Sequence, residues 1–202
     1  MPSLNVRPYI RECVQSVCDQ TLRNIEIICV DAGSTDGTLE ILREFEKNDP
    51  RVTVIVSDKK SYGYQMNLGL KRAQGEYIGI VETDDFASPT MYTNLFAVAT
   101  KKSADVVKAN WHCFQTKPIK HDTLFERYAG VPYNKVLTVD EKKKILDGAS
   151  GIWSGIYRKD FLEKNEIDFL ETPGASYQDT AFLLKVIMAA KSMILRDRKS
   201  VV

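Results

Sequence analysis

Three carboxylates lie within the four residues Glu82-Thr83-Asp84-Asp85. Like charges this close together disfavour ionisation unless a cation is bound among them. Oxygen ligands of this type are typical of Mg²⁺ and Mn²⁺ sites, and these ions commonly bridge carboxylates to the phosphates of a substrate. The alternative is a solvated acidic turn with Asp85 near the cap of the next helix. Because the cluster directly follows an apolar strand pattern at 77–81, we favour the metal site.

A second polar segment, Asp31-Ala32-Gly33-Ser34-Thr35-Asp36-Gly37, follows another apolar strand pattern. Its small residues would allow the backbone to approach a ligand closely. Asp31 could accept a hydrogen bond from a base or a ribose, or simply end the strand. Asp36 could contact the same ligand or only cap the following helix, and the sequence leaves both open.

Both segments are positioned by alternating strand and helix patterns in the first half. Apolar strand patterns fall at 25–30, 52–56, 77–81 and 105–109, and helical patterns at 7–22, 39–45, 68–74 and 88–102. This alternation predicts parallel crossovers and an α/β sheet covered on both faces. Ligands bind such sheets beyond the carboxyl ends of the strands, where both polar segments fall.

The two ends of this pattern are less regular. The opening Met1-Pro2-Ser3-Leu4-Asn5 is loop-like, so the first strand of the sheet is expected to be missing from the sequence. The segment 111–136 has no clear period. Beyond it, a capping box at 138–141 predicts a helix to Asp147, and further patterns predict helices at 159–165 and 178–190 and a strand at 193–195. Without a linker or an internal repeat, we expect one domain over residues 1–202.

Composition excludes several classes of protein. The 28 basic and 27 acidic residues give a net charge of +1, so we expect no nucleic acid partner. The four cysteines, Cys13, Cys18, Cys29 and Cys113, form no CxxC pair and are expected to be reduced thiols. No apolar run of 18 residues and no signal peptide pattern occurs, which predicts a cytoplasmic protein. Contact with a membrane surface and self-association into a homo-oligomer stay open.

Five linked motifs in register resemble the amino half of the family 2 glycosyltransferases across roughly residues 2–100. They are Pro2-x-x-Asn5, Gln20-Thr21, the run Glu26 to Val30 with Asp31-x-Gly33-Ser34-Thr35-Asp36-Gly37-Thr38, Asn67-x-Gly69-Leu70 with Ala73-x-Gly75-Glu76-Tyr77-Ile78, and Thr83-Asp84-Asp85 with Pro89. The second half resembles the bacterial polysaccharide branch more loosely, through Trp153, Tyr157-Arg158, Phe161 and Tyr177-Gln178-Asp179.

The resemblance implies a GT-A fold, which is Rossmann-like with a mostly parallel central sheet. Residues of about 1–109 would form the nucleotide-sugar-binding half and about 110–202 the acceptor-binding half. The implied activity is metal-dependent, inverting transfer of one sugar from a nucleotide-diphosphate donor, with a UDP-sugar expected. The implied acceptor is a glycan or a lipid-linked glycan in surface polysaccharide biosynthesis, and the implied cofactor is Mn²⁺ or Mg²⁺.

The resemblance also implies roles for individual residues. Asp84 and Asp85, the DxD-type pair, would bind the ribose and the metal, and Asp179 would be the general base that deprotonates the acceptor. N-capping of the next helix is the alternative role of Asp179. The other implied contacts to the nucleotide-sugar are Pro2, Asn5, Asp31, Gly33, Ser34, Asp36 and Asn67. The implied acceptor contacts are Trp153, Tyr177 and Gln178.

The chain departs from the family pattern in the expected base pocket. Leu4 replaces a usual Tyr and Ala32 a usual Asp, so we expect base recognition to be weaker or different. Outside this pocket, Met66 replaces a common Arg before Asn67. Gln178 replaces the Glu of an acidic pair, which leaves Asp179 alone as the base.

Two rival functions remain open. One is a nucleotide-binding scaffold that kept the fold and lost turnover. The other is a sugar nucleotidyltransferase, which would need a Gly-rich, Arg-containing phosphate loop that the segment 2–7 does not supply. A dehydrogenase would need G-x-G-x-x-G, which is absent.

Overall fold

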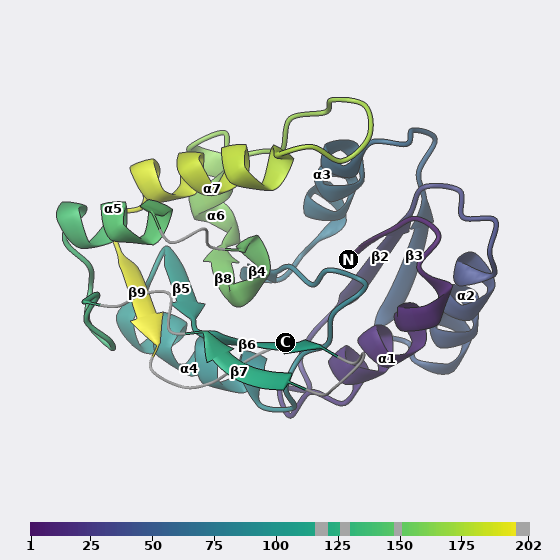
Figure 1. Cartoon of the computed structure of the whole chain (residues 1–202), viewed down its shortest axis with the longest axis horizontal. Helices are drawn as coiled ribbons and strands as arrows, with labels where there is room; N and C mark the ends of the chain where they lie inside the picture. The colour runs from purple at the N-terminus through teal and green to yellow at the C-terminus, as the bar shows by residue number, and fades with distance from the viewer. Residues whose placement is uncertain (116–120, 126–129, 148–150, 197–202) are drawn as a thin grey trace.

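The computed structural model describes residues 1–115, 121–125, 130–147 and 151–196. The predicted α/β class is confirmed, with strands organised in two sheets and a separate hairpin (Figure 1). The first sheet is parallel and has the order β1-β2-β3, with bounds β1 (Pro2–Ser3), β2 (Ile27–Asp31) and β3 (Val52–Val56). Helix α3 packs on β2 and α2 on β3, and α1 packs against α2. These helices are α1 (Arg7–Cys18), α2 (Thr38–Asn48) and α3 (Tyr62–Arg72).

The second sheet is mixed and has the order β4-β8-β5-β9. Strand β8 runs antiparallel to both of its neighbours, whereas β9 runs parallel to β5. Both β8 and β9 come from the half of the chain in which the sequence showed less regularity. The strands are β4 (Tyr77–Gly79), β5 (Val106–Ala109), β8 (Gly155–Arg158) and β9 (Met193–Arg196), and the helices around them are α4 (Met91–Lys102), α5 (Val139–Asp147), α6 (Lys159–Lys164) and α7 (Gln178–Ala189).

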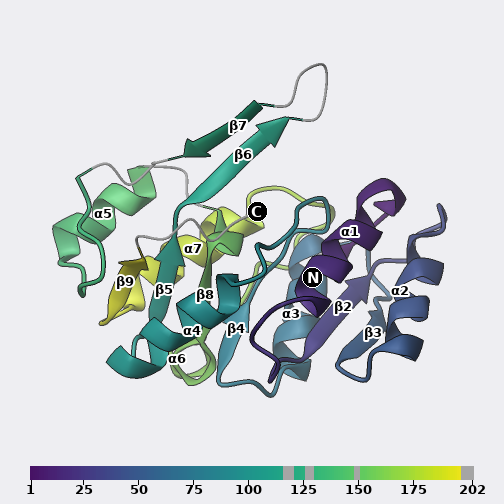
Figure 2. The ribbon, with the colours of Figure 1, turned by 90° about the horizontal axis from the view of Figure 1, so that it is seen from below.

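Strands β6 (Trp111–Gln115) and β7 (His121–Phe125) form an antiparallel hairpin that extends away from the body of the molecule (Figure 2). The sequence pattern did not predict it. Other local predictions need smaller corrections. Helix α4 begins two residues after the predicted Pro89, with Thr90 rather than Ser88 at the N-cap position. The capping box is confirmed, because Thr138 Oγ1 accepts from the Glu141 N–H while Glu141 accepts from the Thr138 N–H.

The first strand is present in part, so the expectation of a loop at the opening of the chain was wrong. Pro2 and Ser3 pair in parallel with Val30 and Asp31, at the carboxyl end of β2. Among the described residues, no strand pairing joins this sheet to the second one. A groove of about 570 Å³ lies there, lined by residues of β2, β4, α3 and α4.

The interior consists of two apolar clusters. One lies between α1, α2, α4 and the first sheet and includes the buried residues Cys13, Leu42 and Leu95. The other surrounds α7 and includes Tyr157, Phe169 and Phe182. The expectation of reduced, buried thiols holds for Cys13, Cys18 and Cys29, whereas the Cys113 side chain lies outside the described residues. Among the helices that the structure describes, none has the length and hydropathy to cross a membrane.

Candidate active site

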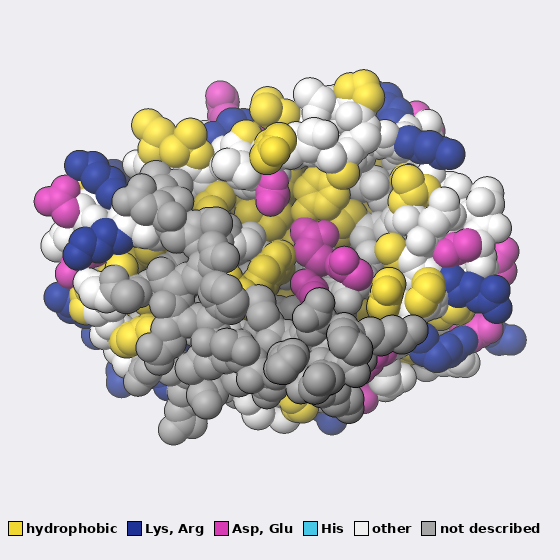
Figure 3. All heavy atoms as spheres, viewed as in Figure 1, with side chains coloured by type: hydrophobic (Ala, Val, Ile, Leu, Met, Phe, Trp, Pro, Cys, Tyr) yellow, Lys and Arg dark blue, Asp and Glu magenta, His cyan; other side chains and the backbone are white. Residues whose placement is uncertain are grey.

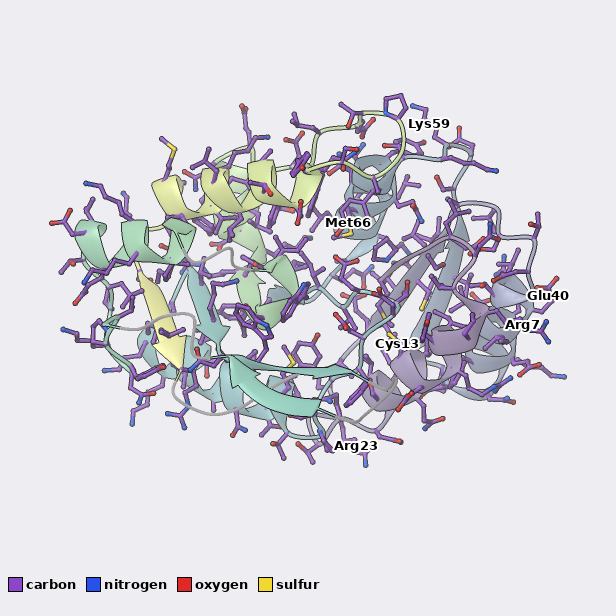
Figure 4. All side chains as sticks on the ribbon, viewed as in Figure 1. Arg7, Cys13, Arg23, Glu40, Lys59 and Met66 are labelled. Atoms are coloured by element: carbon purple, nitrogen blue, oxygen red, sulfur yellow. The ribbon has the colours of Figure 1, made fainter. Side chains whose placement is uncertain are left out.

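The acidic turn Glu82–Asp85 follows β4 at the junction of the two sheets. The Asp85 N–H donates to the Glu82 carbonyl at 3.2 Å and closes the turn. Thr83 Oγ1 donates to the Pro2 carbonyl at 2.8 Å, which ties the turn to β1. From α1, Cys13 Sγ donates to the Glu82 carbonyl at 3.4 Å, and Figure 4 shows the Cys13 side chain in the interior of the molecule. The turn is therefore fixed from two sides, and Figure 3 shows acidic side chains gathered at the centre of one face.

Two of the three carboxylates of the turn, Glu82 and Asp85, are partly buried, whereas Asp84 is exposed. Partial burial, followed by the charge of Asp84, raises the pKa of Asp85 to about 6. Burial also raises the pKa of Glu82, although the Tyr62 hydroxyl donates to Glu82 Oε1 at 2.5 Å and opposes the shift. A cation bound at this turn would favour the ionised form of both carboxylates.

The donor set fits a hard cation only in part. In the portion of the chain that the structure describes, no group of three or more His, Cys, Asp or Glu side chains is placed to hold a metal ion. Adjacent Asp84 and Asp85 offer carboxylate oxygens, and Mg²⁺-type ions are often bound by one or two carboxylates with water and substrate phosphates as the remaining ligands. The residues present therefore fit an ion that binds together with a diphosphate.

Tyr62, in the first turn of α3, bonds the acidic turn. Its hydroxyl contacts Glu82, and the negative charge of Asp179 contributes to raising the Tyr62 pKa after burial and Glu82. Asp179 is exposed in the first turn of α7. The N-cap position of α7 belongs to Tyr177, so the structure does not support N-capping as the role of Asp179. No motif in the sequence marks Tyr62, and its place in the site emerges only from the fold.

Asp31 does not have the free carboxylate that we expected. The residue is fully buried, and its two oxygens accept four hydrogen bonds from its own loop and from β1. The donors are Gly33 N–H (3.0 Å), Ser34 N–H (2.8 Å), Ser34 Oγ (2.6 Å) and Ser3 Oγ (3.0 Å). A buried carboxylate satisfied in this way shapes the loop, so direct contact of Asp31 with a base or ribose is not supported.

Asp36 also has a local structural role. Its carboxylate accepts from the Thr38 hydroxyl and N–H at the start of α2 and from the Arg7 N–H at the start of α1, and the Thr38 hydroxyl bond is the main cause of its lowered pKa. This is the capping alternative, and Figure 4 shows Arg7 beside the start of α2 near Glu40. Asn5, at a φ of 54°, accepts from the Thr35 N–H at 2.9 Å.

Five expected nucleotide contacts are thus engaged in bonds within the protein, whereas Gly33 is left open to a ligand: the five are Pro2, Asn5, Asp31, Ser34 and Asp36. Ser34 Oγ accepts from the Asn5 N–H at 2.9 Å, and the Pro2 carbonyl is used by Thr83. Gly33 has a φ of 77°, and nothing lies within 4 Å of the place where its Cβ would be. Within the loop 31–37, the backbone at Gly33 remains the best candidate for a close approach by the donor.

Asn67 faces the acceptor half instead of the nucleotide loops. It is buried, and its Oδ1 accepts from the Phe169 N–H at 2.9 Å while Nδ2 donates to the Phe169 carbonyl at 2.9 Å and to Glu171 Oε1 at 3.0 Å. Its amide is therefore fully used, and the expected contact with the nucleotide-sugar is not supported.

The three expected acceptor contacts differ in exposure. Gln178 is 2% exposed, and its amide bonds Ser176, Thr172 and Gly174, so it is a structural residue of the loop before α7. Trp153 is partly buried and packs edge-on against Trp111 at 5.0 Å between ring centroids. Tyr177 is 84% exposed and has a φ of 58°. Strained, exposed residues of this kind cluster at functional sites, and Tyr177 alone of the three presents its ring to solvent.

Comparison with known proteins gives the same family as the motifs. The sequence model of glycosyl transferase family 2 matches residues 1–164. The chain is 31% identical to the uncharacterized glycosyltransferase EpsJ of Bacillus subtilis over 207 residues, covering 98% of this chain and 57% of EpsJ. It is 42% identical to the glycosyltransferase GlyG of Streptococcus pneumoniae over 113 residues, covering 55% of this chain and 38% of GlyG. The chain therefore spans little more than half the length of EpsJ.

Solved structures confirm the fold as GT-A. The S. aureus TarS fragment 1–349 in complex with UDP-GlcNAc superposes with a TM-score of 0.84 at 23% identity, over 100% of this chain and 56% of that one. The mannosyltransferase PcManGT of Pyrobaculum calidifontis in complex with GDP-Man and Mn²⁺ superposes with a TM-score of 0.73 at 18% identity, over 100% of this chain and 55% of that one.

Proposed function

Because the chain belongs to glycosyl transferase family 2, we propose that it is a metal-dependent, inverting glycosyltransferase with a nucleotide-diphosphate sugar as donor. The observation that carries this proposal is the hydrogen bond from the Tyr62 hydroxyl to Glu82 in the acidic turn at 82–85. The negative charge of Asp179 also contributes to the raised pKa of this hydroxyl. In this proposal a donor-side acidic turn and an acceptor-side carboxylate would act together, from segments that are about 95 residues apart in the sequence.

On the donor side, Asp84 and Asp85 would hold Mn²⁺ or Mg²⁺, which would stabilise the negative charge of the departing diphosphate. The raised pKa of Asp85 supports this role, because poorly solvated carboxylates gain most from a cation. The Gly33 backbone would lie against the donor. A UDP-sugar is the donor that we propose, in line with the UDP-GlcNAc complex of the structural relative.

On the acceptor side, Asp179 would accept the proton of a sugar hydroxyl. The hydroxyl oxygen would then form a bond to the anomeric carbon of the donor while the bond from that carbon to the diphosphate oxygen breaks. Attack from the opposite face inverts the anomeric configuration. A positioned general base of this type contributes about 10²–10⁴-fold to the rate. The Tyr177 ring would contact the acceptor, for which we propose a glycan or lipid-linked glycan of a surface polysaccharide, in the cytoplasm.

The base pocket should discriminate only weakly between the bases of different nucleotide donors. Ala32 offers no carboxylate to the edge of a base, and the neighbouring Asp31 is already saturated by its own loop. Leu4 is 39% exposed and would cover a base without aromatic stacking. We therefore propose that affinity for the donor comes mainly from the diphosphate and the metal.

The test is calorimetric titration of UDP and of GDP, each with and without Mn²⁺. The wild type is compared with Asp85→Ala and with a control, Asp160→Ala, which removes an exposed carboxylate on α6. We expect Mn²⁺-dependent nucleotide binding that Asp85→Ala abolishes and Asp160→Ala keeps, with UDP and GDP differing by less than about tenfold.

Three results would contradict parts of the proposal. Binding that is independent of Mn²⁺ would exclude the metal site. A strong preference for one base would refute weak discrimination. Mn²⁺-dependent binding without turnover on any acceptor would instead favour a nucleotide-binding scaffold.

A further inference from the structure

Segment 169–174, which leads into α7, is held on the first half of α3 by a set of contacts that no motif indicated. Asn67 bonds both the N–H and the carbonyl of Phe169, as a paired strand residue would. Ser61 Oγ donates to the Thr172 carbonyl at 2.7 Å. Gly174 then pairs with the backbone on both sides of Ser61, because Tyr62 N–H donates to its carbonyl and its own N–H donates to the Lys60 carbonyl.

The fit between helix and segment is close. A Cβ at Gly63 would lie 1.9 Å from the Leu170 carbonyl oxygen, so only glycine allows the segment to lie this near the helix. Of these contacts, those of Asn67 are the most buried, with the side chain 7% exposed and Phe169 1% exposed. Asn67 therefore fixes the segment at its most buried residue.

Phe169 transmits this placement to α7. Its ring stacks on Phe182 with centroids 4.2 Å apart and planes 6° apart. Phe182 lies three residues after Asp179, and residues three apart lie on the same side of a helix. The Tyr62 ring meets Phe169 edge-on at 6.1 Å, and its hydroxyl holds Glu82.

We propose that Asn67 is a positioning residue, which sets the place of Asp179 relative to the acidic turn through Phe169 and Phe182. This role rests on the proposed function of Asp179 as the base, and it differs from the donor contact that the motif implied for Asn67. Because the residue acts through another, its loss should impair turnover without changing affinity for the donor. A misplacement of about 1 Å in an active site can reduce the rate by about 10²-fold.

The experiment compares the wild type with Asn67→Ala, Asn67→Asp and a control, Asn165→Ala. Asn165 also donates from Nδ2 to a main-chain carbonyl, that of Phe161 at 2.8 Å, but only within the end of α6. Asn67→Asp keeps the size and the acceptor for the Phe169 N–H, loses the donor and places a negative charge beside Glu171. The double variant Asn67→Asp with Glu171→Gln removes that repulsion and should recover part of the loss.

Two measurements decide the outcome. Hydrogen–deuterium exchange should become at least about tenfold faster across 169–180 in both Asn67 variants, while β2 and α1 keep their protection. With a donor and acceptor pair on which the wild type turns over, kcat should fall by about 10-fold to 100-fold, with the donor KM and the Kd for UDP with Mn²⁺ within twofold of wild type. Asn165→Ala should change neither.

Unchanged exchange across 169–180 would overturn the proposal, because the segment would then not depend on Asn67. A raised donor KM with unchanged kcat would also overturn it, since Asn67 would then be a donor ligand. Absence of nucleotide binding by the wild type would refute the proposed function instead, and the exchange measurement would still decide whether Asn67 fixes the segment.

Discussion

Asp179 has an exposed carboxylate in the first turn of α7, and no structural bond in the described part of the chain depends on it beyond a long contact with the Thr180 hydroxyl at 3.4 Å. We therefore expect Asp179→Asn to leave the fold and nucleotide binding unchanged and to lower kcat by about 10²–10⁴-fold, the usual contribution of a general base. Steady-state kinetics with the identified donor and acceptor would measure this.

The control for this variant is Asp168→Asn, which removes another exposed carboxylate near α7 that pairs with Lys185 at 2.7 Å. It should keep nearly all of the activity, because exposed ion pairs contribute little to stability. Equal losses in the two variants would show that Asp179 is not the base.

Lys108 on β5 is a second residue whose environment can be tested, through the pH dependence of protein stability. Its side chain is fully buried, and Nζ donates to the Gly151 carbonyl at 2.8 Å and lies 5.9 Å from the centre of the Tyr157 ring. Burial lowers its pKa from 10.5 to about 7. The unfolded chain therefore holds this proton over a range in which the folded protein releases it, so the contribution of Lys108 to the free energy of unfolding rises between about pH 7 and pH 10.5.

We expect the free energy of unfolding of wild type minus that of Lys108→Met to increase across this pH range, by an amount on the order of a few kcal/mol. Urea unfolding at several pH values would measure it. Lys101→Met, at the exposed end of α4, is the control and should give a flat difference. A flat difference for Lys108→Met as well would show that its ammonium group is solvated in the folded protein.

At the scale of elements, the contact between α3 and segment 169–174 can be tested by adding a methyl group to a glycine of the helix. Gly63→Ala would place a Cβ 1.9 Å from the Leu170 carbonyl oxygen, whereas Gly69→Ala in the same helix would meet only Val30 Cγ2 at 3.7 Å. We expect Gly63→Ala to destabilise the protein by about 1–3 kcal/mol and Gly69→Ala to stabilise it by up to about 1 kcal/mol. Urea unfolding of both variants would show whether they change in opposite directions. A Gly63→Ala variant as stable as Gly69→Ala would mean that the segment is not held against α3.

Elements with strong local patterns were predicted well from the sequence. Strand β3 was predicted with its observed bounds, and α5, α6 and α7 were each predicted to within one residue at either end. The start of α3 was placed six residues late, because Tyr62-Gly63-Tyr64 has no helical signal and is helical through its contacts with segment 169–174. Strand β8 and the hairpin β6–β7 were missed, since their pairing depends on partners distant in the sequence or on a register that no apolar period marks.

The site residues, like the elements, divide into those that local sequence motifs indicated and those whose environment depends on the fold. The motifs located the acidic turn and Asp179, and the fold brings both toward Tyr62. The sequence did not reveal which polar groups are satisfied internally. Asp31 and Gln178 are residue types that bind ligands in many proteins, yet neighbours supplied by the fold already occupy their hydrogen-bonding atoms.

At the scale of the whole molecule, the two sheets face each other across a groove of about 570 Å³. Met1 lies at its border, where its ammonium donates to the Ile28 carbonyl at 3.1 Å. Glu26, Ile27 and Ile28 line the groove beside Met1. An extended segment attached ahead of Met1 would therefore enter the groove as a strand paired with β2. The free edge of that strand would then face β4.

We expect an extension of about six Val-rich and Ile-rich residues ahead of Met1 to raise Tm, by roughly 2–4 °C for each kcal/mol gained. Differential scanning calorimetry would measure this against an extension of equal length made of Gly and Ser. Equal Tm values for the two extended proteins would show that the groove does not accept a strand.

Strand β5 lies in the middle of the second sheet, and its two partners come from much later in the chain. Val106 pairs with Tyr157 on one side and with Met193 on the other. During synthesis one edge of β5 therefore stays unpaired while about 45 further residues are made before β8, and the other edge while more than 80 are made before β9. Long-range pairing of this kind slows folding and exposes strand edges to other chains. The second sheet is thus the part of this protein whose folding depends most on the timing of synthesis, and it should be the part that chaperones bind.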